Sequence, residues 1–193
     1  MDFQHKRTFT EKKDNIRKLP ENIIHHILSF LPLKCGVGEL VLDLSGNVRH
    51  SDSTYDDDIR WGMNKFRLPN FLFACLSISS LALTWCILES PHDFKSSKTL
   101  RSVALYGVTI NSVQLSEIIR RSPLLEDLTM SYCDSLMSVK IDHLQLKILT
   151  LESCFDFEEM EIRTPNLKNL QHKGQVCDKP IFSDVSSTMK LPY

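Results

Sequence analysis

Apolar residues recur along most of the chain with a fixed internal spacing. From Ile78 they follow the pattern L-x-x-L-x-L-x-x-N/C-x-L, in which a leading apolar residue is followed three positions later by an L-x-L pair. Further copies begin at Leu100, Leu125, Leu146 and Leu167, so successive copies are 22, 25, 21 and 21 residues apart. Several copies in phase indicate a structural repeat, because one copy of so short a pattern would carry little weight.

The L-x-L pair predicts a short strand with two side chains on one face, since side chains alternate along a strand. Strands from successive copies would stack as a curved parallel sheet, whose apolar side is buried only by neighbouring copies. We therefore expect strands centred near Leu42, Leu83, Leu105, Met130 and Leu151, side by side in that order. The repeat core would consist of Leu81, Leu83, Cys86, Val103, Leu105, Leu128, Met130, Cys133, Leu149, Leu151 and Cys154.

Two segments interrupt the repeat. Residues 50–70 are polar and include four aspartates that could bind a hard cation, but the alternate ligands, central glycine and distal glutamate of a calcium loop are missing. A solvated loop insertion is the favoured interpretation. Residues 112–121 carry Val113, Leu115, Ile118 and Ile119 at helical spacing, so they predict an amphipathic helix on the convex side, with Ser112 near its N-cap. The aspartates are Asp52, Asp56, Asp57 and Asp58.

The cysteines fit the repeat better than they fit redox or metal chemistry. Cys86, Cys133 and Cys154 occupy the Asn/Cys position of the pattern, where Val108 stands in the second copy. No two cysteines form a C-x-x-C pair, so the usual zinc spacing is absent. We expect these three thiols to be buried, unpaired and without a metal. The full set is Cys35, Cys75, Cys86, Cys133, Cys154 and Cys177.

Composition and charge exclude several classes of function. The chain of 193 residues is 42% hydrophobic and has a net charge of −1, so nothing favours binding to nucleic acid or to an anionic membrane. Residues 1–18 are polar and unlike a secretory signal, so we expect the cytoplasm, the nucleus or both. Common catalytic and cofactor motifs are missing, and the adjacent His25 and His26 would point to different faces of a helix. We therefore expect no catalytic residue, metal or cofactor.

The segment 16–34 reads IRKLPENIIHHILSFLPLK and predicts a helix from about Pro20 to Leu31. Its first turn can hold proline, and Pro32 would end it. The apolar stripe is formed by Ile23, Ile24, Ile27, Leu28 and Leu31. An ordinary amphipathic core helix would show the same stripe.

The wording L-P-E-x-I-I-x-x-I-L-S-F-L-P, however, strongly resembles the opening of an F-box. Together with the repeat and the phrases GVGELVLDL at 36–44 and TPNLKNLQHKG at 164–174, the chain resembles the plant F-box/leucine-rich-repeat family. The resemblance implies a short leucine-rich-repeat solenoid of the α/β class. It also implies a Skp-type adaptor of a cullin–RING ubiquitin ligase as the partner of the F-box, and an unidentified target protein as the partner of the repeats. By resemblance the adaptor-binding residues are Leu19, Pro20, Ile23, Ile24, Ile27, Leu28, Leu31 and Pro32.

The F-box is expected to be partial. A family F-box continues past its Leu-Pro with a second helical half, whereas Lys34 is followed here by Cys35 and the strand-like 36–40. A non-ubiquitinating repeat scaffold or decoy that has lost adaptor binding is therefore the alternative function. The expected organisation is a polar tail (1–15), a partial F-box helix (16–34), the repeat region (36–175) with its insertion (50–70), and a C-terminal tail (176–193).

Overall fold

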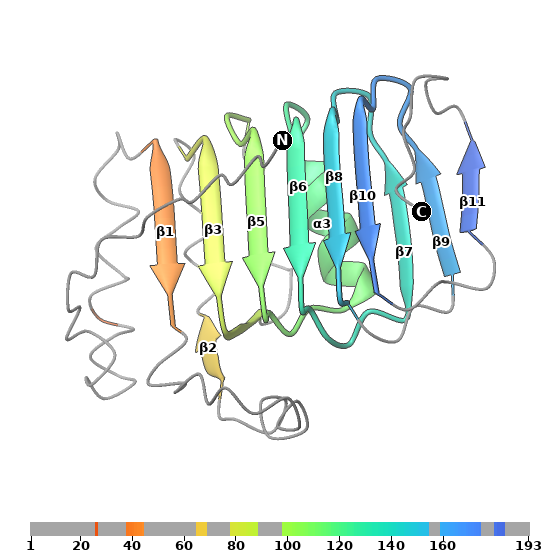
Figure 1. The fold of residues 1–193 in the computed structure, drawn as a ribbon. Coiled ribbons are helices and arrows are strands. Elements are labelled where there is room, and N and C mark those ends of the chain that lie inside the picture. The colour runs from red at the N-terminus through yellow and green to blue at the C-terminus, as the bar shows by residue number, and fades with distance from the viewer. Residues whose placement is uncertain are drawn as a thin grey trace, which may run out of the picture.

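The computed structural model of the chain describes residue 26 and the ranges 38–44, 65–68, 78–88, 98–154, 159–174 and 180–183. These ranges form a solenoid in which parallel strands lie side by side along one axis (Figure 1). The predicted curved parallel sheet is confirmed.

The larger sheet has six strands, and all its pairs are parallel. The register is the same between these neighbouring strands, because the second residue of each L-x-L pair stands opposite its counterpart in the next strand. Leu83 pairs with Leu105, Leu105 with Met130, and Met130 with Leu151. The strands, in spatial order, are β1 (Glu39–Asp43), β3 (Ser80–Thr84), β5 (Ser102–Tyr106), β6 (Asp127–Ser131), β8 (Ile148–Glu152) and β10 (Asn169–Lys173). The five expected strands are thus present in the expected order, and the copy at Leu167 adds a sixth.

A second, three-stranded parallel sheet closes the far side of the later repeats (Figure 1), and we did not predict it. Its strands are β7 (Ser138–Asp142), β9 (Glu159–Arg163) and β11 (Pro180–Ser183). They begin 21 residues apart, which is also the spacing of β6, β8 and β10. Alternating apolar residues in SVKID and EMEIR are the signal that was missed. Residues 180–183 were assigned to a tail, and this was wrong, because β11 pairs with β9.

The helix α3 (Ser112–Arg121) takes the far side in the repeat between β5 and β6. The amphipathic helix is confirmed with Leu115, Ile118 and Ile119 buried, but Val113, which was counted among its apolar positions, is exposed. The N-cap is Asn111, the residue before Ser112, because the Asn111 side chain accepts from Gln114 N while the Gln114 side chain accepts from Asn111 N. The Gln114 amide also donates to Leu88 O at 2.7 Å, which ties the helix to β4 (Cys86–Leu88).

The insertion at 50–70 is not a loop throughout. Phe66–Leu68 form strand β2, which pairs in parallel with β4. Leu68 is fully buried, and Phe66 packs against the core. The loop assignment is therefore wrong for these three residues. The four aspartates of the insertion lie outside the described residues, as does the predicted helix at 20–31 except for His26, which is helical and exposed.

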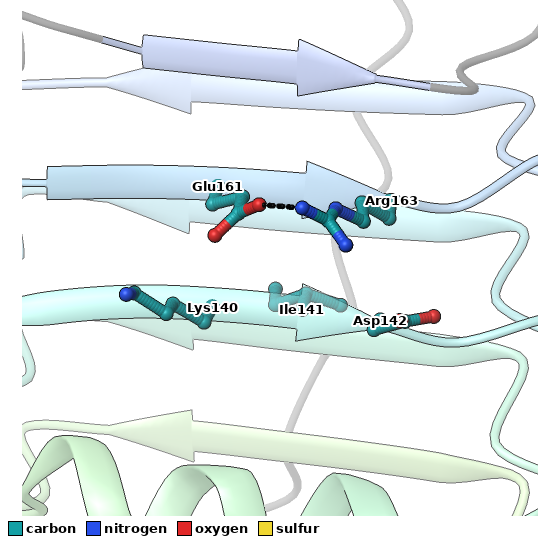
Figure 2. A pocket seen from close by; sticks show the side chains of 5 residues that line it. All are labelled: Lys140, Ile141, Asp142, Glu161 and Arg163. Atoms are coloured by element: carbon teal, nitrogen blue, oxygen red, sulfur yellow. Dashed lines mark hydrogen bonds and ion pairs between the residues drawn. The ribbon is translucent and has the colours of Figure 1, made fainter.

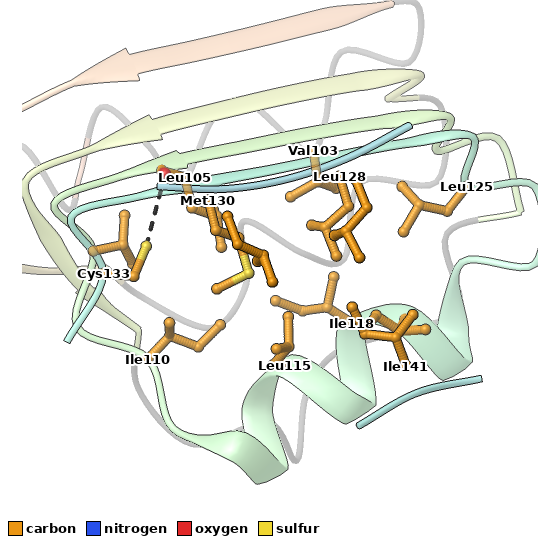
Figure 3. Close-up of a cluster of buried hydrophobic side chains, with 14 of the residues drawn as sticks. Val103, Leu105, Ile110, Leu115, Ile118, Leu125, Leu128, Met130, Cys133 and Ile141 are labelled. Atoms are coloured by element: carbon orange, nitrogen blue, oxygen red, sulfur yellow. Dashed lines mark hydrogen bonds between the residues drawn. The ribbon is translucent and has the colours of Figure 1, made fainter. Parts of the chain in front are cut away.

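One continuous core runs between the two layers (Figure 3). Leu115 and Ile118 of α3 face Leu128 and Met130 of β6 there, and Ile141 of β7 lies beside the helix. All eleven residues of the proposed repeat core are buried, with at most 4% exposure. Because both layers supply leucine-sized side chains, each repeat is covered only when its neighbours are in place.

Replacing a core leucine should therefore destabilise the whole solenoid. Leu128→Ala removes a side chain with 0% exposure, so we expect the free energy of unfolding to fall by about 2–5 kcal/mol. The matched control is Leu144→Ala, where the leucine is 65% exposed, and a change within about 0.5 kcal/mol is expected. Urea unfolding measures both, and equal losses in the two variants would contradict this packing.

Candidate interaction surface

The six-stranded sheet turns three rows of side chains away from the core and two rows toward it. Side chains at the first, third and fifth positions of each strand point away from the core, and Ser131 alone among them is buried. We call this set the open face. It consists of Glu39, Val41, Asp43, Ser80, Ala82, Thr84, Ser102, Ala104, Tyr106, Asp127, Thr129, Ser131, Ile148, Thr150, Glu152, Asn169, Gln171 and Lys173.

The middle row of the open face is formed largely by small side chains. The strand registers align Ala82, Ala104, Thr129 and Thr150, all of which are small, across four neighbouring strands. Small side chains across four strands leave the middle of the open face accessible to a second chain. The flanking rows also contain small residues, namely Ser80, Ser102 and Ser131.

At the strand starts, a ladder of charges forms a rim. Arg101 Nη1 and Lys147 Nζ each lie 2.6 Å from a Glu126 carboxylate oxygen, and Lys168 occupies the next step of the same backbone ladder. The hydrogen bond from Lys147 is the main reason that the pKa of Glu126 lies below its usual value. The Glu126 side chain is 33% exposed and both of its partners are more exposed than that, so this ladder orders the rim without adding much stability.

At the strand ends, aromatic rings replace the charges. Tyr106 and Tyr132 have ring centroids 5.1 Å apart, and Trp85 meets Tyr106 edge-on at 6.1 Å. Trp85 and Tyr132 both have positive φ, at the corner where the chain leaves the strand. Gly107 occupies the same corner between them with φ +61°, and a Cβ there would lie 2.9 Å from the indole of Trp85. Glycine at this position is what lets the aromatic rings come together.

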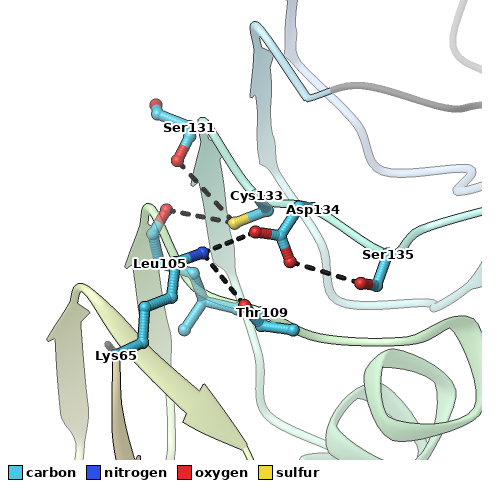
Figure 4. A network of polar contacts seen from close by, with 7 residues as sticks. All are labelled: Lys65, Leu105, Thr109, Ser131, Cys133, Asp134 and Ser135. Atoms are coloured by element: carbon cyan, nitrogen blue, oxygen red, sulfur yellow. Dashed lines mark hydrogen bonds and ion pairs between the residues drawn. The ribbon is translucent and has the colours of Figure 1, made fainter. Parts of the chain in front are cut away.

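Lys65 joins the insertion to three repeats. Its Nζ donates to Thr109 Oγ1 at 2.9 Å and to Asp134 Oδ2 at 2.5 Å (Figure 4). It also lies 5.7 Å from the ring centroid of Trp85. The Lys65 side chain is 4% exposed and that of Asp134 is 22% exposed. Lys65 was not predicted as a functional residue, because a lysine in a polar stretch is expected to be solvated, and its partner Asp134 lies 69 residues away in the chain.

The three repeat cysteines are free and buried. The Cys133 thiol lies 3.7 Å from Leu105 O and the Cys154 thiol 3.6 Å from Met130 O, so each thiol satisfies a carbonyl of the preceding repeat. Burial raises the pKa of Cys86 to about 12. The neighbouring Cys154 and burial together raise the pKa of Cys133 well above its usual value. These thiols are structural groups that replace the asparagine of the pattern.

The described residues form no well-defined site for a metal ion or a small molecule. No group of three or more ligand side chains gathers among them, and none of their helices is long and apolar enough to cross a membrane. A shallow depression on β7 and β9 is lined by charged side chains, two of which, Glu161 and Arg163, pair with each other (Figure 2). The residues proposed for adaptor binding, Leu19 to Pro32, lie outside the described part of the chain.

A parallel solenoid with an open sheet face and a buried cysteine position defines a leucine-rich-repeat module. The chain belongs to the leucine-rich-repeat domain family described as At1g61320/AtMIF1, LRR domain, whose sequence model matches residues 64–191. It is also similar to the F-box/FBD/LRR-repeat protein At1g13570 of Arabidopsis thaliana, with 35% identity over 79 residues. The match covers 41% of this chain and 19% of that relative, so it spans about a fifth of the relative's length. No solved structure matches the chain.

Removing the Lys65 charge should loosen the insertion from the repeats. In Lys65→Met the aliphatic stem remains while Asp134 loses its cation, so the free energy of unfolding should fall. We expect less than the roughly 3–5 kcal/mol of a fully buried pair, because Asp134 is partly hydrated. Urea unfolding of Lys65→Met, Asp134→Asn and the double variant gives the coupling between the two groups. Lys140→Met is the control, since Lys140 lies 3.8 Å from Glu159 on an exposed surface. Strictly additive effects of the two substitutions would contradict the pairing.

The repeat thiols should be inert in the folded protein. With a pKa of about 12, Cys86 would be ionised to about one part in ten thousand at pH 8, against about a tenth in an unfolded chain with the ordinary pKa of 9.0. Iodoacetamide labelling followed by peptide mapping should therefore find Cys86 and Cys133 modified only after denaturation. The hydrogen bond with Cys133 lowers the pKa of Cys154, so its protection depends on burial, and we expect it too to react only after denaturation. Because the folded pKa is raised, the stability from the neutral Cys86 thiol is complete below about pH 9 and is lost as the pH rises toward 12. Rapid native labelling of all three thiols would refute their burial.

Proposed function

We propose that the protein is a substrate-recognition subunit of an SCF-type cullin–RING ubiquitin ligase. Residues 16–34 dock on the Skp-type adaptor, and the open face of the repeats binds the protein to be ubiquitinated. The observation that carries the proposal is the F-box opening LPENIIHHILSFLP placed directly before a leucine-rich-repeat solenoid. The F-box/FBD/LRR-repeat name of the Arabidopsis relative supports the same combination.

The structure of the repeats is compatible with a binding role that needs no catalysis. Seventeen of the eighteen side chains of the open face are not buried, so the core does not depend on them. Solenoids of this kind offer an extended face to a partner protein. The buried thiols are stable in a reducing compartment, which agrees with the cytoplasm and nucleus as the places of action.

A second candidate function is a repeat scaffold that does not recruit the ligase. The observation that favours it is the short distance between the F-box opening and the solenoid. Pro32 is followed by β1 at Glu39, which pairs with β3 and is already part of the repeat sheet. A second F-box helix does not fit into the six intervening residues.

The adaptor-binding helix gives the sharpest test between these two functions. Ile27→Ala with Leu28→Ala shortens two side chains of the apolar stripe, and each truncation costs on the order of 2–5 kcal/mol at a buried site. If the helix docks on the adaptor, affinity should fall by more than tenfold, since about 1.4 kcal/mol corresponds to a factor of ten. His26→Ala is the control on the same helix, because His26 is exposed, and its affinity should be unchanged.

The measurement is a pull-down and a titration with a purified Skp-type adaptor, beside a melting curve for each variant. A version of the chain with a complete F-box serves as the positive control. Binding that persists unchanged in the double variant would refute the docking role of this helix. Binding by the complete F-box version alone, with a lower melting temperature in the double variant, would favour the scaffold.

A further inference from the structure

We infer that the strand ends of the open face bind a basic segment of the target protein, with an Arg or Lys side chain seated against Tyr106 and Tyr132 beside Glu152. The inference deepens the proposed target-binding role and rests on it. It gives the partner a chemical character that the repeat fold alone does not supply.

The two ends of the strands carry different groups. At the strand starts three cations and three carboxylates balance, and Arg101 and Lys147 are already paired with Glu126. The cations are Arg101, Lys147 and Lys168, and the carboxylates are Glu39, Glu126 and Asp127. At the ends of β5, β6 and β8 the one charged side chain of the open face is Glu152, and the next cation along the row is Lys173 of β10.

The carboxylate of Glu152 is weakly neutralised. Its distance to Lys173 Nζ is 3.7 Å, and the two side chains are 36% and 70% exposed. An exposed pair at this distance contributes little, so an incoming cation can compete with Lys173 for the carboxylate. A guanidinium group would do so best, since its planar fork donates two parallel hydrogen bonds to one carboxylate.

The aromatic rings stand in the adjoining position. Register places Tyr106, Ser131 and Glu152 in one row across three strands, and Tyr132 follows Ser131 directly. The Tyr106 side chain is 40% exposed, which leaves ring surface open to solvent. A cation over a tyrosine face is attracted by the ring electrons, and a neighbouring carboxylate adds to that attraction. Together these groups form a site for one positively charged side chain.

The protein itself already uses this chemistry one repeat earlier. Lys65 Nζ lies over Trp85 and is paired with Asp134, so an ammonium group sits between an aromatic ring and a carboxylate. Trp85 also meets Tyr106 edge-on, which makes it the first ring of the same aromatic series. The arrangement around Lys65 is thus an internal example of what Tyr132 and Glu152 offer to an external side chain.

The middle row of the open face suits an extended segment, because its side chains are small. The small row through Ala82, Ala104, Thr129 and Thr150 leads across the strands beside the aromatic end. The charged rim lies five residues away along each strand, or about 16 Å at the usual rise of a strand. A peptide lying on the small middle row at the aromatic end would therefore meet Glu152 well before it met the charged rim.

The test uses the full chain and three fluorescein-labelled decapeptides of alternating residues: Gly-Arg, Gly-Gln and Gly-Glu. Fluorescence anisotropy at low salt should show binding of the Gly-Arg peptide alone. Glu152→Gln and Tyr106→Ala should each weaken that binding about three- to tenfold, whereas Tyr106→Phe, which keeps the ring, should retain it. Glu161→Gln on β9 removes the same charge from the opposite sheet and should leave binding unchanged.

Three results would overturn the inference. The first is no binding of the Gly-Arg peptide up to about 1 mM. The second is equal weakening by Glu161→Gln and Glu152→Gln. The third is preference for the Gly-Glu peptide, which would assign the interaction to the cations of the charged rim. Melting curves show whether Tyr106→Ala is folded, and the conservative Glu152→Gln keeps the test valid if it is not. The assay contains no adaptor, so a failure here is separate from a failure of ligase recruitment, which Ile27→Ala with Leu28→Ala reports.

Discussion

The in-register stacking of one repeat on the next is the constraint on which the rest of this structure depends. A single strand with two leucines and its return segment has no interior, so its apolar side is buried only by the copies before and after it. The unbroken registers from β1 to β10 satisfy this requirement. The same stacking fixes the rows of the open face, because side chains at equal positions must then stand beside one another.

The far side of the solenoid tolerates more variety than the sheet. Between β5 and β6 the chain returns through α3, and in the next repeats it returns through β7 and β9. Both solutions bury Leu- and Ile-sized side chains against the same leucine row, and α3 packs beside β7. The 25-residue repeat returns through a ten-residue helix, whereas the 21-residue repeats return through strands. The return element thus changes with repeat length in this chain.

Several side-chain contacts join one repeat of this solenoid to another. Lys65 reaches Thr109 and Asp134, and the rings of Trp85, Tyr106 and Tyr132 meet across three repeats. Cys133 and Cys154 each contact a carbonyl of the repeat before. The consequence is that the insertion, the aromatic end of the open face and the cysteine position are coupled through one corner of the fold.

The sequence by itself determined the repeat, the order of its strands, the burial of Leu128, Met130 and Cys133, and the position of α3. These depend on periodicity, and alternation along a strand turns periodicity directly into burial. It predicted neither β2 nor the second sheet, although the alternation of Val139, Ile141, Met160 and Ile162 carried a readable signal for β7 and β9. Only the tertiary structure decided that Lys65 pairs with Asp134 and that the rings of Trp85, Tyr106 and Tyr132 meet. Such contacts join residues far apart in the chain, and their partners are defined only once the register of every intervening repeat has been set.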